Sequence, residues 1–282
     1  MADSNVQLQW TDEQWNKVRQ VVYEEARRAR VAGSFLPLFG PLDPDATYVT
    51  RELLLDPTQT LAGFSVDDTG VQKLSTLQVK IYLRGAQVAD PELASALIAF
   101  RRAANIVARL EDKIIFRGQP AAGQPPSPDI GEVVGGERTE GLLDGQPRHT
   151  IRVPGTGGAA LVTAVSQAIA ALEQAHHLGP FACVLGNQYF NEVQTPQPNS
   201  LVLPQDRILP FLGGGALLRT STLPDDRGLV IALGGQPIDL VVGTDISVNF
   251  LQVTLVPWFV FRVYEKIVLR IKQIPAIAVL HP

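Results

Sequence analysis

The sequence of 282 residues is 45% hydrophobic and carries a formal net charge of −4. A chain of this length can bury about 75% of the surface that it exposes when unfolded, so its core needs no disulfide bond or metal ion. The negative charge argues against a surface that packages nucleic acid, which would carry an excess of basic residues. Cys183 is the only cysteine, which excludes an intrachain disulfide bond and fits a reducing compartment.

The N-terminal residues predict neither a signal peptide nor a membrane anchor. Residues 1–10 are polar and lack the basic and apolar regions of a secretory signal. No apolar run approaches the length of about 20 residues that a membrane span needs. We therefore expect a soluble, cytoplasmic protein that forms one large domain or two small ones.

The first predicted helix begins after Thr11. Thr11 and Gln14 form a capping-box pattern, in which each side chain accepts a hydrogen bond from the backbone of the other residue. Gly33 is expected to end the helix, and Pro37 keeps the apolar segment 35–41 extended. Apolar residues at three- and four-residue spacing share one face of this helix: Trp15, Val18, Val22, Ala26 and Ala29.

An arm and a strand are predicted next. Residues 48–71 combine small apolar clusters with proline, glycine and acidic residues, which indicates a two-stranded arm or a long loop. Residues 77–83 alternate between apolar and polar side chains and predict a half-buried strand.

A long helix is predicted at 91–112, because Asp90 suits the N-cap and Pro91 the first helical position. Glu111 and Asp112 are then expected to be exposed carboxylates at the helix end. The alternative is a salt bridge from this pair to Arg117 or to a neighbouring subunit.

The second half of the chain mixes strands with one more helix, which favours the α+β class over a regular α/β alternation. A Gly- and Pro-rich connection is expected at 119–137 and a proline-rich loop at 194–210. The helix is expected at 158–177, and strands at 149–153, 181–185, 229–233, 238–242, 246–272 and 276–280.

Motifs that would indicate catalysis or cofactor binding are weak. Gly155 to Ala160 fits the G-x-G-x-x-A pattern of a dinucleotide site, but no acidic residue ends the next strand, so a tight turn before a helix is the better interpretation. His176 and His177 point in different directions on a helix, and no other ligand is at metal-binding spacing. No serine-nucleophile elbow is present. The basic clusters around Arg27 and Arg101 fit a solvated or intersubunit role better than nucleic-acid contact.

Several segments resemble the family 1 encapsulin shell proteins, which share the fold of tailed-phage capsid proteins. The run from Glu111 to Gly118 resembles the end of the family's spine helix. Further segments follow the family's order: residues 11–15, Gly40-Pro41, 179–185, 245–248, 261–263, 269–272 and 276–277.

The resemblance implies an HK97-type capsid fold with a P-domain, an A-domain and an E-loop. Its parts would be an N-terminal helix and the start of the P-domain at 1–47, the E-loop at 48–72, the P-domain with the spine helix at 73–157, the A-domain at 158–235, and the C-terminal P-domain strands at 236–282. Many copies would assemble into an icosahedral shell around a cargo enzyme of ferritin-like or peroxidase type.

The resemblance also implies two sites. A C-terminal targeting peptide of the cargo would bind an apolar groove between the N-terminal helix and a P-domain strand, formed by Val18, Val22, Ala26, Phe35, Leu36, Leu38, Ile238, Leu240 and Val242. A loop would line the five-fold pore with Gln194, Pro196, Gln197, Asn199 and Ser200.

Segment 32–39 lacks the Gly-Arg and acidic residues that the family commonly carries before Gly-Pro. This difference favours recognition of the peptide through apolar contacts alone. Some members bind flavin through an aromatic pair before the spine helix; this chain has no Trp there, so no flavin is expected.

The alternatives to an encapsulin shell protein are a major capsid protein of a phage or prophage and a soluble enzyme. Because the balance of charge is acidic, nucleic acid is not expected as a partner.

Overall fold

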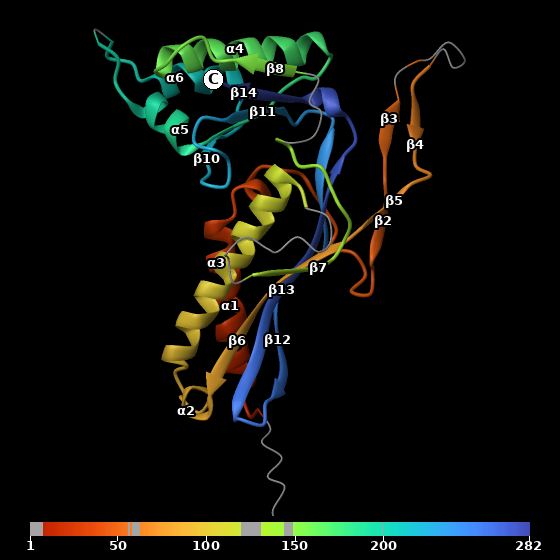
Figure 1. The fold of residues 1–282 in the computed structure, drawn as a ribbon, viewed down its shortest axis with the longest axis vertical. Coiled ribbons are helices and arrows are strands. Elements are labelled where there is room, and N and C mark those ends of the chain that lie inside the picture. The colour runs from red at the N-terminus through yellow and green to blue at the C-terminus, as the bar shows by residue number, and fades with distance from the viewer. Residues whose placement is uncertain (1–7, 56, 58–62, 120–130, 144–148, 199) are drawn as a thin grey trace, which may run out of the picture.

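The computed structural model describes residues 8–55, 57, 63–119, 131–143, 149–198 and 200–282. These residues form an elongated body, a second unit at one end of it and a projecting arm (Figure 1). The helices are α1 Asp12–Ala29, α2 Gly85–Val88, α3 Ala94–Arg117, α4 Gly158–Gln174, α5 Asn187–Gln194 and α6 Pro204–Ile208, with short 3-10 helices η1 Ala32–Ser34, η2 Leu209–Leu212 and η3 Ile274–Ala276.

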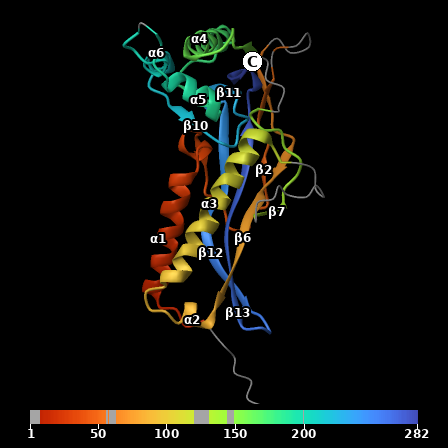
Figure 2. The same ribbon diagram turned by 60° about the vertical axis from the view of Figure 1, so that its left-hand side comes forward.

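The body is built on a five-stranded sheet in the order β1-β12-β13-β6-β7. Its strands are β1 Leu38–Phe39, β6 Ser75–Arg84, β7 Glu132–Gly135, β12 Ile238–Val253 and β13 Trp258–Ile271. The long β12 and β13 strands pair antiparallel, and both α1 and α3 pack against this sheet (Figure 2). Side chains on alternate positions of β13, including Phe259, Phe261 and Val263, enter the core beneath the helices, as the period of two in this segment predicts.

Aromatic side chains hold the beginning of α1 to the body. Trp10 stacks on Phe261 with ring centroids 4.8 Å apart, and its indole N–H donates to the carbonyl of Val88 at 3.0 Å. Trp15 meets Trp10 edge to face at 5.0 Å. The capping box of Thr11 and Gln14 is formed as predicted, so the helix begins where the sequence places it.

The second unit is a five-stranded sheet in the order β10-β9-β11-β14-β8, with α4 packed on one face. Its strands are β8 His149–Arg152, β9 Phe181–Leu185, β10 Leu217–Arg219, β11 Gly228–Ala232 and β14 Ile277–His281. Alternate residues face α4 or the body: Val230 lies in the core under α4, whereas Leu229 and Ile231 join the core of the body. Both faces are therefore buried, which explains the continuous apolar run of β9.

The expected division of the chain at 236 differs from the observed sheets. Within the segment 236–282, β12 and β13 belong to the body, but β14 lies in the second sheet between β11 and β8. The expected loop at 194–210 is also wrong in part, because Pro204 begins the short helix α6. A proline can occupy the first position of a helix as well as interrupt one. For Pro204 only interruption is inferred from the sequence, which is why a loop is predicted there.

The arm comprises residues 48–73 and consists of two short antiparallel ladders, β2 Tyr48–Thr50 with β5 Val71–Lys73 and β3 Leu53–Leu55 with β4 Ser65–Asp67. A buried ion cluster fixes its base. The guanidinium of Arg270 contacts Asp239 at 2.7 Å and reaches Glu52 of the arm at 2.9 Å. The two-stranded arm predicted from the mixed composition is therefore present.

The helix α3 differs from its predicted limits at both ends. Leu93 has φ +54°, so the helical backbone begins only at Ala94, while the Asp90 carboxylate accepts hydrogen bonds from the N–H groups of Glu92 and Ala94. The helix continues to Arg117 because Ile114, Ile115 and Phe116 are buried along its last turns.

Gly118 ends α3 with φ +77°, and a Cβ atom there would collide with the carbonyl oxygen of Thr139. We expect Gly118→Ala to lower the free energy of unfolding by more than about 1 kcal/mol, because alanine is strained at positive φ. Gly63→Ala is the control, since a Cβ at Gly63 meets nothing within 4 Å. Chemical denaturation of both variants measures the effect, and equal stabilities would contradict the assignment.

Candidate functional site

A groove lies between α1 and the edge of the body sheet. It has a volume of about 290 Å³. Its apolar lining comes from Tyr23 on α1, Leu38 on β1, and Val242 and Ile246 on β12. Leu38 is 59% exposed although it is a strand residue, and Tyr23 is 49% exposed. Exposed apolar side chains that converge on a concave surface are typical of a binding site.

The expected groove residues divide between this groove and the core. Leu38 and Val242 line the groove, and Phe35 is half-buried against the core. The others form the core itself, where they are at most 4% exposed: Val18, Val22, Ala26, Leu36, Ile238 and Leu240. The sequence identified the apolar face of α1 correctly, but that face packs onto the sheet, and the groove lies along its flank.

The groove also has charged walls that the sequence analysis did not assign to it. Arg27, Arg30 and Asp245 contribute to the lining. The groove therefore combines apolar and charged side chains. Tyr23 and Ile246 were missed because a position at the edge of an amphipathic face has no distinctive spacing in the sequence.

Beneath the groove, Arg30 joins α1 to the rest of the body through a buried ion cluster. Its guanidinium contacts Glu111 of α3 at 3.1 Å, Glu265 of β13 at 3.0 Å and Asp245 of β12 at 3.7 Å. Glu111 and Glu265 are each 1% exposed. The expectation of exposed carboxylates at a helix end is therefore wrong for Glu111, and its partner is Arg30 rather than Arg117.

Asp112 fixes the turn that follows α1. Its carboxylate accepts hydrogen bonds from the backbone N–H of Val31 at 3.0 Å and of Ala32 at 2.7 Å. It is 2% exposed, so the expectation of exposure is wrong for this residue as well. The reason is that α3 does not end at 112, and the pair lies where α3 crosses the end of α1.

Burial dominates the ionisation of this cluster. It raises the pKa of Glu265 to about 7, even though Arg30 opposes the shift. Burial, together with the charge of Glu265, raises the pKa of Glu111 well above its ordinary value. Burial also raises the pKa of Asp112 to about 7, against the lowering effect of the backbone N–H of Ala32. Both oxygens of Glu111 and Oε1 of Glu265 lack a conventional hydrogen-bond donor among the described residues. A proton shared between these two carboxyl groups would engage one of these oxygens from each residue.

Four of the five expected pore residues lie at the outer corner of the second unit, at the end of α5 and in the segment that leads to α6 (Figure 1). Gln194 ends α5 and its side-chain amide donates to the side-chain oxygen of Gln205, whereas Pro196 is exposed. Gln197 and Ser200 are half-buried, and Asn199 lies outside the described residues. The neighbouring Leu201 is fully exposed, which leaves this corner apolar as well as polar.

The glycine-rich motif before α4 has a structural role. Gly157 precedes α4, and its N–H donates to Glu192 at 2.9 Å, so the glycine-rich segment forms a turn onto a helix. In the described part of the chain, His, Cys, Asp and Glu side chains do not gather into a group of three or more that could hold a metal ion. Within the same ranges, none of the helices combines the length and apolar character that crossing a bilayer requires.

A family model described as Linocin_M18, encapsulating protein for peroxidase, matches residues 7–268. The chain belongs to this family. It is 26% identical over 290 aligned positions to the type 1 encapsulin shell protein EncA of Myxococcus xanthus (strain DK1622), an alignment that covers 95% of this chain and 92% of EncA.

Solved structures agree on the fold. The virus-like particle from Pyrococcus furiosus matches with a TM-score of 0.72 at 15% identity, over 95% of this chain and 100% of that one. The capsid of Myoviridae phage XM1 matches with a TM-score of 0.58 at 14% identity, over 85% of this chain and 88% of that one. The fold is therefore the α+β, phage-capsid type that the resemblance to family 1 encapsulin shell proteins implied.

We expect the acidic cluster to make stability depend on pH. An unfolded glutamate has a pKa of about 4.3. Glu265 has a pKa of about 7 in the folded state. The folded state therefore holds more protons between these values, and the free energy of unfolding falls as pH rises through this window, by roughly 1–3 kcal/mol.

Glu265→Gln keeps a hydrogen-bond donor toward Glu111 but cannot ionise, so this variant should show a flatter decline in the unfolding midpoint from pH 4.5 to 7.5. Glu24→Gln, at an exposed position on α1, is the control and should follow the wild type. Identical slopes for Glu265→Gln and the wild type would rule out the proton-linked cluster.

Proposed function

We propose that the chain is the shell subunit of an encapsulin nanocompartment, a closed icosahedral protein cage in the cytoplasm that encloses a cargo enzyme. The observation that carries this proposal is the match of the family model to residues 7–268. The role is structural, and the subunit itself is not an enzyme. The cargo would be an enzyme of ferritin-like or peroxidase type, and small molecules or ions would enter through pores.

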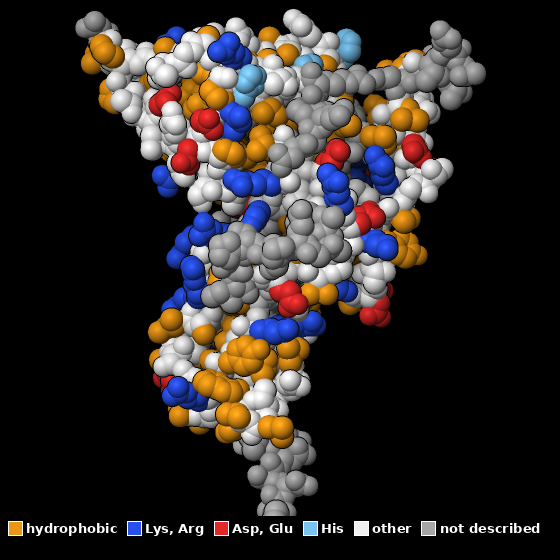
Figure 3. Space-filling view, viewed as in Figure 1, with side chains coloured by type: hydrophobic (Ala, Val, Ile, Leu, Met, Phe, Trp, Pro, Cys, Tyr) orange, Lys and Arg blue, Asp and Glu red, His pale blue; other side chains and the backbone are white. Residues whose placement is uncertain are grey.

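The distribution of exposed apolar side chains supports assembly. Several of the most exposed ones lie at the extremities of the subunit: Phe64 and Val66 on the arm, Leu255 and Val256 at the turn between β12 and β13, and Leu201 in the segment between α5 and α6. Figure 3 shows hydrophobic side chains gathered at the lower end of the body and on the projecting parts. Exposed apolar surface does not stabilise a monomer in water, whereas neighbouring subunits can bury it and so stabilise an assembly.

A major capsid protein of a phage or prophage is the second candidate, because phage capsids share the fold. The net charge of −4 disfavours a container for DNA. The helix α1 also favours the encapsulin proposal, since it packs on α3 and β12 as part of the subunit core, whereas phage relatives usually carry a scaffold or a longer arm there.

For cargo recognition, we propose that the groove of Tyr23, Leu38, Val242 and Ile246 binds the C-terminal targeting peptide of the cargo enzyme. Its volume of about 290 Å³ is at the lower end for ligand sites, so it suits a few apolar side chains rather than a folded surface. Arg27 and Asp245 at its walls can select charges at the flanks of the peptide. We propose that the five-fold pore is lined by Gln194, Pro196, Gln197, Asn199 and Ser200.

Electron microscopy of the purified protein tests the shell. We expect closed particles for the wild type, and only small species for the double variant Phe64→Asp with Val66→Asp, because buried unpaired charges oppose contact between subunits. The conservative pair Phe64→Leu with Val66→Ile should still assemble. Wild-type protein that forms only monomers or dimers would refute the shell proposal.

Co-expression with a cargo enzyme tests the groove. We expect Tyr23→Asp or Ile246→Asp to lower the cargo that co-purifies by about tenfold or more, since each places a carboxylate against the apolar part of the peptide. Particles should still form, because Tyr23 is exposed and Ile246 is only partly buried. Gln20→Asp adds the same charge to an exposed position of α1 and should load normally. Unchanged loading of both groove variants would show that the peptide binds elsewhere.

A further inference from the structure

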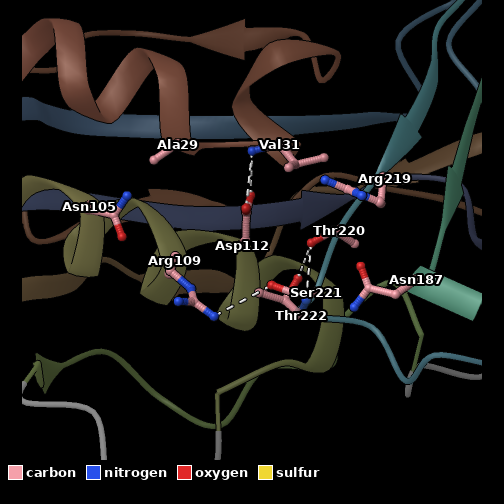
Figure 4. A pocket seen from close by; sticks show the side chains of 10 residues that line it. All are labelled: Ala29, Val31, Asn105, Arg109, Asp112, Asn187, Arg219, Thr220, Ser221 and Thr222. Carbon is pink, nitrogen blue, oxygen red and sulfur yellow. Dashed lines mark hydrogen bonds between the residues drawn. The ribbon is translucent and has the colours of Figure 1, made fainter. Parts of the chain in front are cut away.

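A polar pocket that the shell function does not use lies where the body meets the second unit. It has a volume of about 300 Å³ and is lined by residues from four places (Figure 4). Arg109 comes from α3 of the body, and Ala29 and Val31 from the end of α1. Arg219 ends β10, the segment Thr220–Thr222 follows it, and Asn187 begins α5. The cavity is therefore shared between the body and the second unit.

Two guanidinium groups reach this pocket from opposite sides of the segment Thr220–Thr222 (Figure 4). Arg109 donates to the hydroxyl of Ser221 at 3.5 Å, and Arg219 lies over the ring of Phe190 at 5.6 Å. Among the residues that the structure describes, no carboxylate lies within 4 Å of either guanidinium. Arginine side chains at such positions bind planar or tetrahedral oxyanions well.

The hydroxyl groups between the arginines are held in place. Thr220 is 4% exposed and its hydroxyl accepts from the N–H of Thr222 at 3.1 Å. The hydroxyls of Thr220 and Thr222 are 2.7 Å apart and share a hydrogen bond. Ser221 accepts from Arg109, which leaves its own proton available to donate to a ligand.

Two carboxylates near the pocket already accept hydrogen bonds from other groups of the protein. Asp112 lies in the wall, but its oxygens accept hydrogen bonds from the backbone of Val31 and Ala32. Asp225 accepts from the side chain of Asn187 at 3.1 Å. Neither group is paired with the arginines, so the positive charge of the pocket is left for another anion.

A second, smaller basic pocket adjoins the first. It has a volume of about 160 Å³ and shares Arg109, Ser221 and Thr222 with the first pocket, while Lys113 and Arg117 complete its lining. Arg109, Lys113 and Arg117 are spaced four residues apart on α3 and therefore share one side of the helix. Figure 3 shows Lys and Arg side chains gathered along this edge of the body.

We propose that these two adjoining pockets bind a diphosphate-bearing small molecule, with one phosphate between Arg109 and Arg219 and the next between Arg109, Lys113 and Arg117. Inorganic pyrophosphate and the diphosphate of a nucleotide share this chemistry. A ligand there contacts both the body and the second unit. Because it binds the folded state and not the unfolded chain, it raises the free energy of unfolding of the subunit.

Isothermal titration of assembled wild-type particles with inorganic pyrophosphate at low ionic strength tests the site. We expect one site per subunit, with pyrophosphate bound about tenfold more tightly than orthophosphate because it fills both pockets. Arg109→Gln should weaken both ligands by about tenfold or more, since Arg109 serves both pockets. Arg117→Gln should weaken pyrophosphate but leave orthophosphate unchanged, and ADP in place of pyrophosphate distinguishes a nucleotide from the free anion.

Arg101→Gln is the matched control, because Arg101 is an exposed arginine on α3 outside both pockets. It should bind pyrophosphate as the wild type does. An equal loss for Arg101→Gln, or displacement of pyrophosphate by a single-stranded oligonucleotide, would indicate a general basic surface and overturn the proposal, as would the absence of saturable binding. Electron micrographs of each variant show whether particles still form. A lack of pyrophosphate binding by intact wild-type particles would overturn the binding proposal but leave the shell proposal standing.

Discussion

The packing of the body depends on the ion cluster around Arg30. Arg30 is the point at which α1, α3, β12 and β13 meet, and its contacts with the buried Glu111 and Glu265 replace the water that these groups lose on folding, while Asp245 adds a contact at the exposed edge of the cluster. Asp112 fixes the adjacent turn through the backbone of Val31 and Ala32. Because the end of α1 is held there, Tyr23 and Arg27 are placed along the groove rather than over the core.

The carboxylates outnumber the cation, and this imbalance has a physical consequence. Burial makes each ionised group costly, so the cluster retains a proton near neutral pH. A core of apolar residues would avoid that cost. The arrangement instead fixes the direction in which α1 crosses α3, because only one placement brings Arg30 within reach of three carboxylates.

Local patterns in the sequence predict much of this fold. The cap at Thr11, the period of two in β13 and the turn before α4 were all predicted from spacing, because each depends on neighbours along the chain. The burial of Glu111 was not, because it depends on Arg30, which is remote in sequence. The groove residues were missed for a related reason: whether Val22 or Tyr23 faces solvent is decided by where the sheet lies, not by the helix alone.

The strand order of the second sheet determines when that unit can fold while the chain is being synthesised. Strand β14, at residues 277–281, lies between β11 and β8, and β8 is formed by residues 149–152. Until residues 277–281 have left the ribosome, β11 and β8 each expose an unpaired strand edge, and the second unit has no closed core. A growing chain can therefore complete the second unit only after residues 277–281 have been made, although most of that unit's other elements precede residue 233.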